Sequence, residues 1–404
     1  MFTLSKDTLD SFAVFWIIAS SGFVVINYIF MIPCMIVLFS IALIYMHYNT
    51  KLVKDNLKIL VGVFLFILID EAITLLTTDF PFVLENMVIF FIRLISLAVI
   101  QSNIEINEFK KKYVNIVTAI CAMCLICYVL VKILGITLPF TGTYGDPNYY
   151  GTFYYQSKQN ASNSFRNSGP YGEAGMFAIT IILALTFVLF DSGKNISRKN
   201  LIKLVILVIT LFTTQSGTGM LCFAIMLICY AMKDGFSLKN FRNPVMIVAL
   251  MAMIIGFFFF ESSYGIISGK ILYKGGSYGV RIDDTMQGYS IGWKYFWFGT
   301  GICNDYSSVW GGLLIGSRSN GMANLVASSG YPFLMFYIYR LMKQCYEYTE
   351  KNIFYFLTLT VIVICIYNTQ PVVIQTIGLS FIFRWKQKNR KFTIYERGNA
   401  HHVC

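Results

Sequence analysis

The stretch from Ser11 to His47, SFAVFWIIASSGFVVINYIFMIPCMIVLFSIALIYMH, carries no Asp, Glu, Lys or Arg. A helix that crosses a bilayer needs about 20 apolar residues. This stretch is too long for one such helix and just long enough for two short ones, so we expect a turn near Asn27. Because its apolar character continues well beyond the length of a leader, it predicts a membrane anchor rather than a cleaved signal peptide.

The rest of the 404-residue chain has the same character, since 56% of the residues are hydrophobic, 13% are charged and the mean hydropathy is +0.64. This composition excludes a soluble globular protein and predicts an all-α integral membrane protein with one polytopic membrane domain spanning residues 1–404. We expect about twelve transmembrane helices. After the first two, the spans are predicted at 57–76, 83–101, 113–134, 173–190, 201–215, 217–232, 244–260, 321–342, 352–368 and 371–384.

The basic residues test this topology. A net charge of +12 would suggest nucleic acid in a soluble protein, but here most of the excess lies in short connections, so we expect no nucleic-acid partner. The alternate short connections 77–82, 213–219 and 369–370 carry no Lys or Arg, which places them outside the cytoplasm and both termini inside. The basic connections contain Lys51, Lys54 and Lys58; Lys110, Lys111 and Lys112; Lys194, Arg198, Lys199 and Lys203; Lys233, Lys239 and Arg242; Arg340, Lys343 and Lys351; and a tail with Arg384, Lys386, Lys388, Arg390 and Lys391.

Two connections, about 135–172 and 261–320, are long, and this topology places both outside. Each has one Arg beside carboxylates, in Arg166-Asn-Ser-Gly-Pro-Tyr-Gly-Glu173 and in Gly279-Val-Arg-Ile-Asp-Asp284. Since cytoplasmic loops normally collect the Lys and Arg of a membrane protein, an outer Arg beside the bilayer needs another reason. An anionic, lipid-linked substrate is the reason we expect.

Aromatic residues crowd both outer loops. An interfacial belt of Trp and Tyr accounts for part of them, above all for Trp293 to Phe298. The others are suited to stacking on sugar rings, and Tyr289 and Trp293 are the candidates that we place in a substrate site.

If the substrate is a glycan on a polyprenyl pyrophosphate, negative charge builds on the pyrophosphate as the glycosidic bond breaks. Arg166 and Arg281 suit that charge, because a guanidinium binds phosphate oxygens bidentately and stays charged. The outer loops contain no His and no Asp-X-Asp motif, which predicts a metal-independent reaction. Glu173, Asp283 and Asp284 are the candidate bases for the acceptor hydroxyl. Equally, Glu173 fits a helix N-terminus and the two Asp residues fit pairing with Arg281.

A few reactive side chains lie within the predicted spans. Asp70 and Glu71 fall at a depth similar to that of Arg93, so Arg93 is either their structural partner or faces a cavity for a lipid phosphate. Cys121, Cys124 and Cys127 repeat every three residues, but no His or carboxylate joins them. Buried thiols explain this repeat better than a metal site does.

Four elements resemble the superfamily of O-antigen polymerases and ligases, Wzy-type polymerases among them, over about residues 140–340. They are Arg166-X-X-Gly169 followed by Glu173; Thr214-Gln-Ser-Gly-Thr-Gly219; Arg281 followed by Trp293 to Phe298 and by Gly299-Thr-Gly301; and Ser319-Asn320 followed by Ser329-Gly330, which we expect to open a span.

Members of this family join glycan repeat units at the outer face of the membrane from undecaprenyl-pyrophosphate donors. The resemblance implies a bacterial inner-membrane glycosyltransferase that needs no cofactor, makes O-antigen or capsule, and has a chain-length regulator and a flippase as partners. It also implies pyrophosphate binding by Arg166 and Arg281. The residues it places in contact with substrate are Gly169, Arg318, Ser319 and Asn320.

Other functions stay open at this point. The ligase branch has a His where Ser319 or Asn320 stands here, and the three His residues of this chain are predicted at the cytoplasmic side, which favours a polymerase. Twelve spans with both ends inside also fit a transporter or a lipid-linked oligosaccharide flippase. Long outer loops bearing Arg favour an enzyme over these and over a non-catalytic scaffold.

Overall fold

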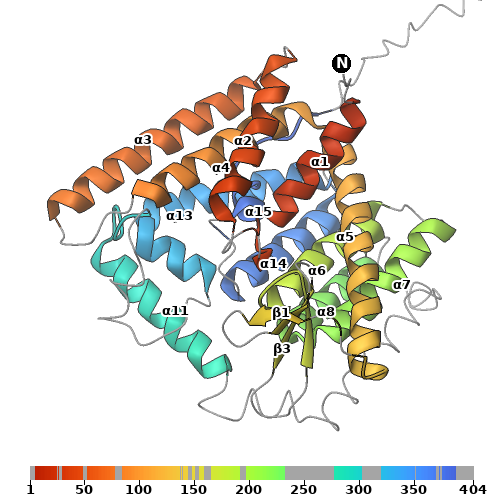
Figure 1. Ribbon diagram of the computed structural model, residues 1–404. Coiled ribbons are helices and arrows are strands. Elements are labelled where there is room, and N and C mark those ends of the chain that lie inside the picture. The colour runs from red at the N-terminus through yellow and green to blue at the C-terminus, as the bar shows by residue number, and fades with distance from the viewer. Residues whose placement is uncertain are drawn as a thin grey trace, which may run out of the picture.

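The structure is a computed structural model, and helices make up most of its described residues (Figure 1). They are α1 (Lys6–Ala19), α2 (Met31–His47), α3 (Lys54–Thr77), α4 (Leu84–Asn103), α5 (Ile106–Tyr128, continued by a π-helical turn Val129–Ile133), α6 (Ala174–Asp191), α7 (Arg198–Thr213), α8 (Gly217–Met232), α11 (Ser277–Lys294), α13 (Gly321–Tyr348), α14 (Ile353–Thr369) and α15 (Thr376–Leu379). The described residues are 5–24, 26, 30–48, 52–77, 84–136, 138, 140–143, 148–150, 154–158, 165–191, 197–232, 277–302, 320–350, 352–369, 373 and 375–387.

Four helices of the described chain are long and apolar enough to cross a membrane: α3, α4, α6 and the continuous Ile106–Ile133. The shorter apolar helices α2, α8 and α14 also coincide with predicted spans. The expectation of a helical membrane protein is supported to this extent. The predicted span at 244–260 lies outside the described residues.

The side chains of α3 are distributed as expected for a helix surrounded by lipid. Between residues 59 and 76 its exposed side chains are apolar, and they include Leu65, Ile69 and Leu76. The polar side chains of this part, Asp70, Glu71 and Thr74, are buried against the protein. Lys54, Asp55 and Lys58 are exposed in the first turns of the helix. In water the distribution would be reversed, because polar groups that are buried must find partners while apolar groups gain from burial.

The structure is mostly helical, as expected, but the long connection 135–172 also contains a four-stranded antiparallel sheet that the sequence did not predict. Its strands pair in chain order: β1 (Phe140–Thr143), β2 (Asn148–Tyr150), β3 (Tyr154–Lys158) and β4 (Phe165–Gly169). Figure 1 shows the sheet beside the half of α5 that is distant from the labelled N-terminus.

Tyrosines explain why this loop forms strands. Tyr149 pairs with Tyr155 and Tyr150 with Tyr154 across β2 and β3. Aromatic residues favour β-strands, so this run of tyrosines favours the pairing of β2 with β3. Tyr154 and Tyr155 are buried, so they belong to the core rather than to a sugar-stacking surface or a belt.

The predicted last span at 371–384 is also wrong as a helix. Among the described residues of this span only the four of α15 are helical, and residues 380–387 continue as turns and extended chain. Most of this irregular segment, 375–387, is buried. Non-helical backbone within a membrane protein is tolerated only where protein groups satisfy its N–H and C=O groups.

Side chains from α3, α4 and α13 provide these partners. Each donates a hydrogen bond to a carbonyl of the irregular segment: Tyr337 Oη to Gly378 O (2.8 Å), Gln101 Nε2 to Ser380 O (3.0 Å), Arg340 Nε to Ile382 O (2.8 Å) and Asn56 Nδ2 to Arg384 O (2.8 Å). Asn56 also accepts from the Arg384 N–H at 2.7 Å. Arg340 was expected in a cytoplasmic connection, but it lies buried within α13 because the last segment needs its guanidinium.

The two ends of the described chain meet at one charged face. Lys386 pairs with Glu105 in a parallel bridge at the start of α5, and Arg384 forms an ion pair with Asp55 at 3.3 Å. At the other end of the chain, Asp7 of α1 binds Lys112 of α5 at 2.6 Å. We call this end of the bundle the charged face.

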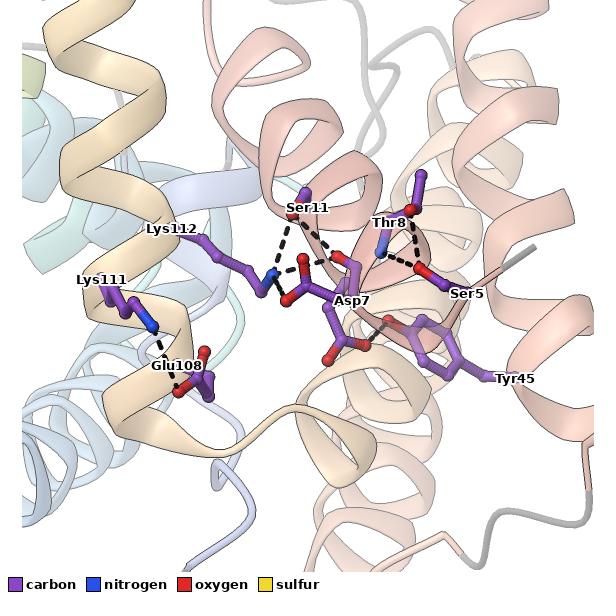
Figure 2. A network of polar contacts seen from close by, with 9 residues as sticks. Ser5, Asp7, Thr8, Ser11, Tyr45, Glu108, Lys111 and Lys112 are labelled. Atoms are coloured by element: carbon purple, nitrogen blue, oxygen red, sulfur yellow. Dashed lines mark hydrogen bonds and ion pairs between the residues drawn. The ribbon is translucent and has the colours of Figure 1, made fainter.

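Figure 2 shows how Lys112 reaches from α5 to α1, where its ammonium donates to Asp7 and to the Ser11 hydroxyl. The hydrogen bond from Lys112 to Asp7, together with the positive charge of Lys112, holds the pKa of the exposed Asp7 carboxyl below its usual value. Tyr45 of α2 donates to Asp10 in the same region, at 2.5 Å. Lys110 and Lys112 were expected in a loop, but both lie buried in the first turns of α5, because carboxylates there pair with them.

We predict that Asn56→Ala destabilises the protein, because it leaves the partly buried N–H and C=O of Arg384 without their side-chain partner. An orphaned buried group costs about 1–3 kcal/mol. The expected result is a lower Tm of the purified protein in detergent. Lys58→Ala is the control, since Lys58 is exposed on the same helix and its truncation should change stability by less than about 0.5 kcal/mol. Equal Tm values for the two variants would contradict the role given to Asn56.

Candidate functional site

Two of the four sequence elements come together at β4. The Nε of Arg166 donates to the carbonyl of Thr214 at 3.1 Å, although 48 residues separate them. Beside it, Asn167 Nδ2 donates to the Thr213 hydroxyl at 2.8 Å. The Arg-X-X-Gly element is therefore fixed on the turn between α7 and α8, and we call this the Arg166 cluster.

The turn itself is buried and tightly held. Thr214, Gln215 and Ser216 are all buried, and Gln215 has a positive φ of 51°. Ser216 begins α8 by accepting the N–H of Gly219 on its hydroxyl at 3.2 Å. A Cβ at Gly219 would lie 2.9 Å from the Cβ of Ala178, so glycine permits α8 to approach α6 here.

Gly169 ends β4 in a conformation that favours glycine. Its φ is +55°, and a Cβ there would lie 2.7 Å from the ring of Phe177. Its N–H donates to Asn167 Oδ1 at 3.0 Å, which closes the turn. The resemblance gives Gly169 a role in substrate binding, and the structure gives it a conformational one.

The chain then turns into α6. The carbonyl of Pro170 accepts the N–H of Val24 at 3.1 Å, and Tyr171 packs edge to face on Phe23 with ring centroids 5.1 Å apart. Glu173 immediately precedes α6, as predicted, and it is exposed. A carboxylate at this position is favoured by the positive end of the helix dipole and is also accessible from outside the fold.

The other two sequence elements meet where α11 packs on α13. Gly288 lies against Ala323, and Gly292 lies against Val326, with hypothetical Cβ distances of 2.7 and 2.9 Å. The residue numbers at these contacts increase together on both helices, so the two helices run parallel. Small residues spaced by four positions allow such close approach, as in membrane helix pairs.

Asn320 holds the beginning of this helix pair. Its Oδ1 accepts the N–H of Ala323 at 3.0 Å, which caps α13, and its Nδ2 donates to the Thr285 hydroxyl of α11 at 2.7 Å. Arg318 and Ser319, the two other residues predicted to contact substrate here, lie outside the described residues.

The turn after α11 folds back onto the middle of α13. Thr300 N donates to Ala327 O at 2.9 Å, and Tyr331 N donates to Phe296 O at 2.9 Å. Gly330 has a φ of +74°, and a Cβ there would lie 2.6 Å from Phe296 O. Gly330 is non-helical and separates two helical segments within α13, so a helical segment does begin after Ser329-Gly330, as expected, and the turn packs against this break.

The candidate catalytic residues of α11 fall near its first turns. Arg281 belongs to this helix, but its side chain lies outside the described part of the structure. Asp283 is exposed and Asp284 is half-buried.

The aromatic candidates lie further along α11. Tyr289 is half-buried, and 71% of Trp293 is exposed. The ring of Trp293 contacts Phe296 and Tyr331 edge to face, with centroids 5.7 and 6.0 Å away. This exposed ring suits either a belt or a sugar-stacking surface.

The charges within the spans do not pair as one prediction proposed. Among the described residues no ion pair joins Arg93 to Asp70 or Glu71, and the Nε of Arg93 is buried without a hydrogen-bond partner. Asp70 is fully buried, and its carboxylate interacts with the backbone of Ile302 in the turn that follows α11. Next to this carboxylate, Phe66 of α3 stacks on Phe298 and Phe333, so α3 covers the turn that follows α11.

Sequence reasoning missed Asn167 and Thr213. Asn167 lies within Arg166-X-X-Gly169, and Thr213 directly precedes the motif that begins at Thr214. Their polar side chains next to motif residues were the only indication in the sequence. Cys121 and Cys124 are free and buried, as predicted, whereas Cys127 is free and only half-buried. In the part of the chain that the structure describes, no group of three His, Cys, Asp or Glu residues is arranged to hold a metal ion.

Comparison with known proteins adds nothing to these observations. No protein-family model matches the chain, no curated protein matches it, and no solved structure matches its fold.

We predict that Gly292→Val separates α11 from α13, because the added side chain would occupy the space of Val326. Overpacking of this kind typically costs about 1–3 kcal/mol. The measurement is the Tm of the purified protein. Ser290→Val is the matched control, since Ser290 is exposed on the same helix and the same side chain is introduced. If both variants melt alike, close packing at Gly292 does not stabilise the pair.

Proposed function

We propose that this chain is a membrane glycosyltransferase that polymerises lipid-linked oligosaccharide repeat units at the outer face of the bacterial inner membrane. The donor and the acceptor are both glycans on undecaprenyl pyrophosphate. The product is O-antigen or capsular polysaccharide, and a flippase and a chain-length regulator would act with the enzyme.

One observation carries this proposal: the hydrogen bond that fixes the Arg166 guanidinium on the turn at Thr214. This contact brings together two sequence elements, Arg166-X-X-Gly169 and the turn at Thr214, that resemble those of the polymerase family. A guanidinium whose Nε is held by a carbonyl has a fixed plane, and its fork matches the geometry of pyrophosphate oxygens. Electrostatic stabilisation is strongest when such a donor is oriented before the reaction.

In the proposed reaction, the bond between the donor sugar and its pyrophosphate breaks, and the electron pair leaves with the pyrophosphate. Arg166 and Arg281 stabilise the departing charge. The hydroxyl oxygen of the acceptor sugar forms the new glycosidic bond and loses its proton to a carboxylate, for which Glu173, Asp283 and Asp284 are the candidates. Because the leaving group is already a good one, the reaction needs no general acid, and we propose that it needs no metal.

We also propose that both termini lie in the cytoplasm and that the charged face adjoins it. The arrangement of Asp7 with Lys112 and of Lys386 with Glu105 supports this, because it brings the two described ends to the same end of the bundle. The irregular segment 375–387 then makes the last crossing in place of a twelfth helix. The sheet and the Arg166 cluster face the outside.

We expect Arg166→Ala to reduce polymerisation by at least about 100-fold, because removal of one pre-oriented donor costs roughly that much in rate. Arg166→Lys should fail as well, since an ammonium lacks the planar fork. The measurement is polymer length on a gel of surface polysaccharide, with the membrane level of the protein measured in parallel. Arg384→Ala, which removes a partly exposed Arg at the charged face, is the control. Long polymer in both Arg166→Ala and Arg281→Ala cells would end this mechanism.

Deletion of the gene in its own host separates the alternative functions. We expect the long ladder to disappear while the core still carries a single repeat unit, because transfer of single units does not need a polymerase. Loss of every repeat, with polymer accumulating on the lipid carrier, would instead assign a ligase. An unchanged ladder would exclude both enzymes and leave a transporter.

A further inference from the structure

A cavity of about 620 Å³ opens at the charged face, at the opposite end of the bundle from the Arg166 cluster. It is formed by the first turns of α5, α7 and α14 and by the ends of α6 and α13. Its volume falls within the range of pockets that hold small ligands. The function proposed above makes no use of it.

Three helices begin at this cavity. Asn107 lies in the first turn of α5, Asn200 lies in that of α7, and Asn352 caps α14 by accepting the N–H of Tyr355 at 3.0 Å. Ser197 caps α7 in the same way through the N–H of Asn200, at 3.3 Å. The positive ends of three helix dipoles therefore converge at the cavity, and such ends favour anions.

The lysines of the cavity are not all neutralised by the protein. Lys110 is, because its ammonium donates to Asp191 and to the carbonyl of Tyr348, both at 3.0 Å. Lys111 approaches Glu108 only to 3.9 Å, and both side chains are substantially exposed, so this pair is weak (Figure 2).

The positive charge of Lys203 is compensated even less than that of Lys111. Its ammonium donates to the amide oxygen of Asn115 at 2.6 Å, and it has no ion-pair partner among the described residues. Lys111 and Lys199 lie near enough to repel its charge. The remaining carboxylate of the cavity, Glu350, accepts from Asn107 at 3.0 Å. An anion between Lys111 and Lys203 would relieve this repulsion.

The inner wall of the cavity is apolar and consists of Val114, Phe187, Val188 and Phe190. A small inorganic anion has no use for such a wall, whereas a phosphate joined to glycerol and acyl chains does. Basic pockets between membrane helices are known to accept anionic lipid headgroups.

We propose that this cavity binds the headgroup of an anionic glycerophospholipid from the leaflet that adjoins the charged face. The phosphate lies between Lys111 and Lys203, and the glycerol hydroxyls meet the amides of Asn107, Asn200 and Asn352. The bound lipid links α5, α7 and α14 at the ends where they start. This proposal is independent of glycosyl transfer at the other face.

The test uses the full-length protein purified in detergent, with lipid binding measured by native mass spectrometry. Phosphatidylglycerol should remain bound under conditions that strip phosphatidylcholine. Lys203→Ala should weaken phosphatidylglycerol binding about fivefold, since one Lys near an anionic headgroup contributes roughly that factor. Lys203→Arg should keep it. Lys343→Ala, an exposed Lys of α13 that does not line the cavity, should leave it unchanged.

Equal binding of the two lipids, or equal loss with Lys203→Ala and Lys343→Ala, would overturn the proposal. Millimolar inorganic phosphate is the competing probe. If it displaces phosphatidylglycerol and alone raises the Tm as much as the lipid does, the site belongs to a soluble phosphate compound and the lipid assignment is wrong. Lys111→Ala serves as the second variant should Lys203→Ala fail to fold, and the same fivefold loss is expected of it.

Discussion

Backbone N–H and C=O groups inside an apolar bundle must find protein partners, because no water competes for them there. Residues 375–387 meet this constraint with only the four-residue helix α15, and Asn56, Gln101 and Arg340 supply the missing partners from three different elements. These bonds tie the end of the chain to α3, α4 and α13. The arrangement brings Lys386 to the start of α5 and thereby places both described ends at the charged face.

The opposite end of the bundle is held by close backbone approach rather than by polar side chains. Glycines at 169, 219, 292 and 330 occur where a Cβ would overlap a neighbouring residue. Their absence of a side chain lets β4 rest on α6 and lets α11 lie along α13. Gly169 and Gly219 therefore position the segments around Arg166, and Gly292 and Gly330 position the helix pair that carries Asp283 and Asp284. A site assembled on packed elements in this way keeps its charges in fixed positions, as transition-state stabilisation requires.

The two ends are suited to different chemistry, although both present cationic side chains. At the end distant from the charged face, a guanidinium fixed by Thr214 is suited to a pyrophosphate that carries charge as a bond breaks. At the charged face, Lys111 and Lys203 lie beside an apolar wall and are suited to a phosphate that stays bound. Planar, pre-oriented Arg and mobile, point-charge Lys match these two tasks.

The sequence by itself determined what depends on the composition of each segment. The apolar runs predicted most of the helices, including α3, α4 and α6, because hydrophobic length alone decides whether a segment prefers lipid. The sequence motifs also indicated that Arg166 and Asn320 belong to candidate site segments. The tertiary structure alone decided the partners of these side chains. Arg340 looks in sequence like any basic residue near a helix end, yet it is buried because a carbonyl at Ile382 needs a donor. Likewise, nothing in the apolar run 371–384 reveals that side chains distant in sequence satisfy its backbone, so only the folded chain could replace the predicted helix by an irregular segment.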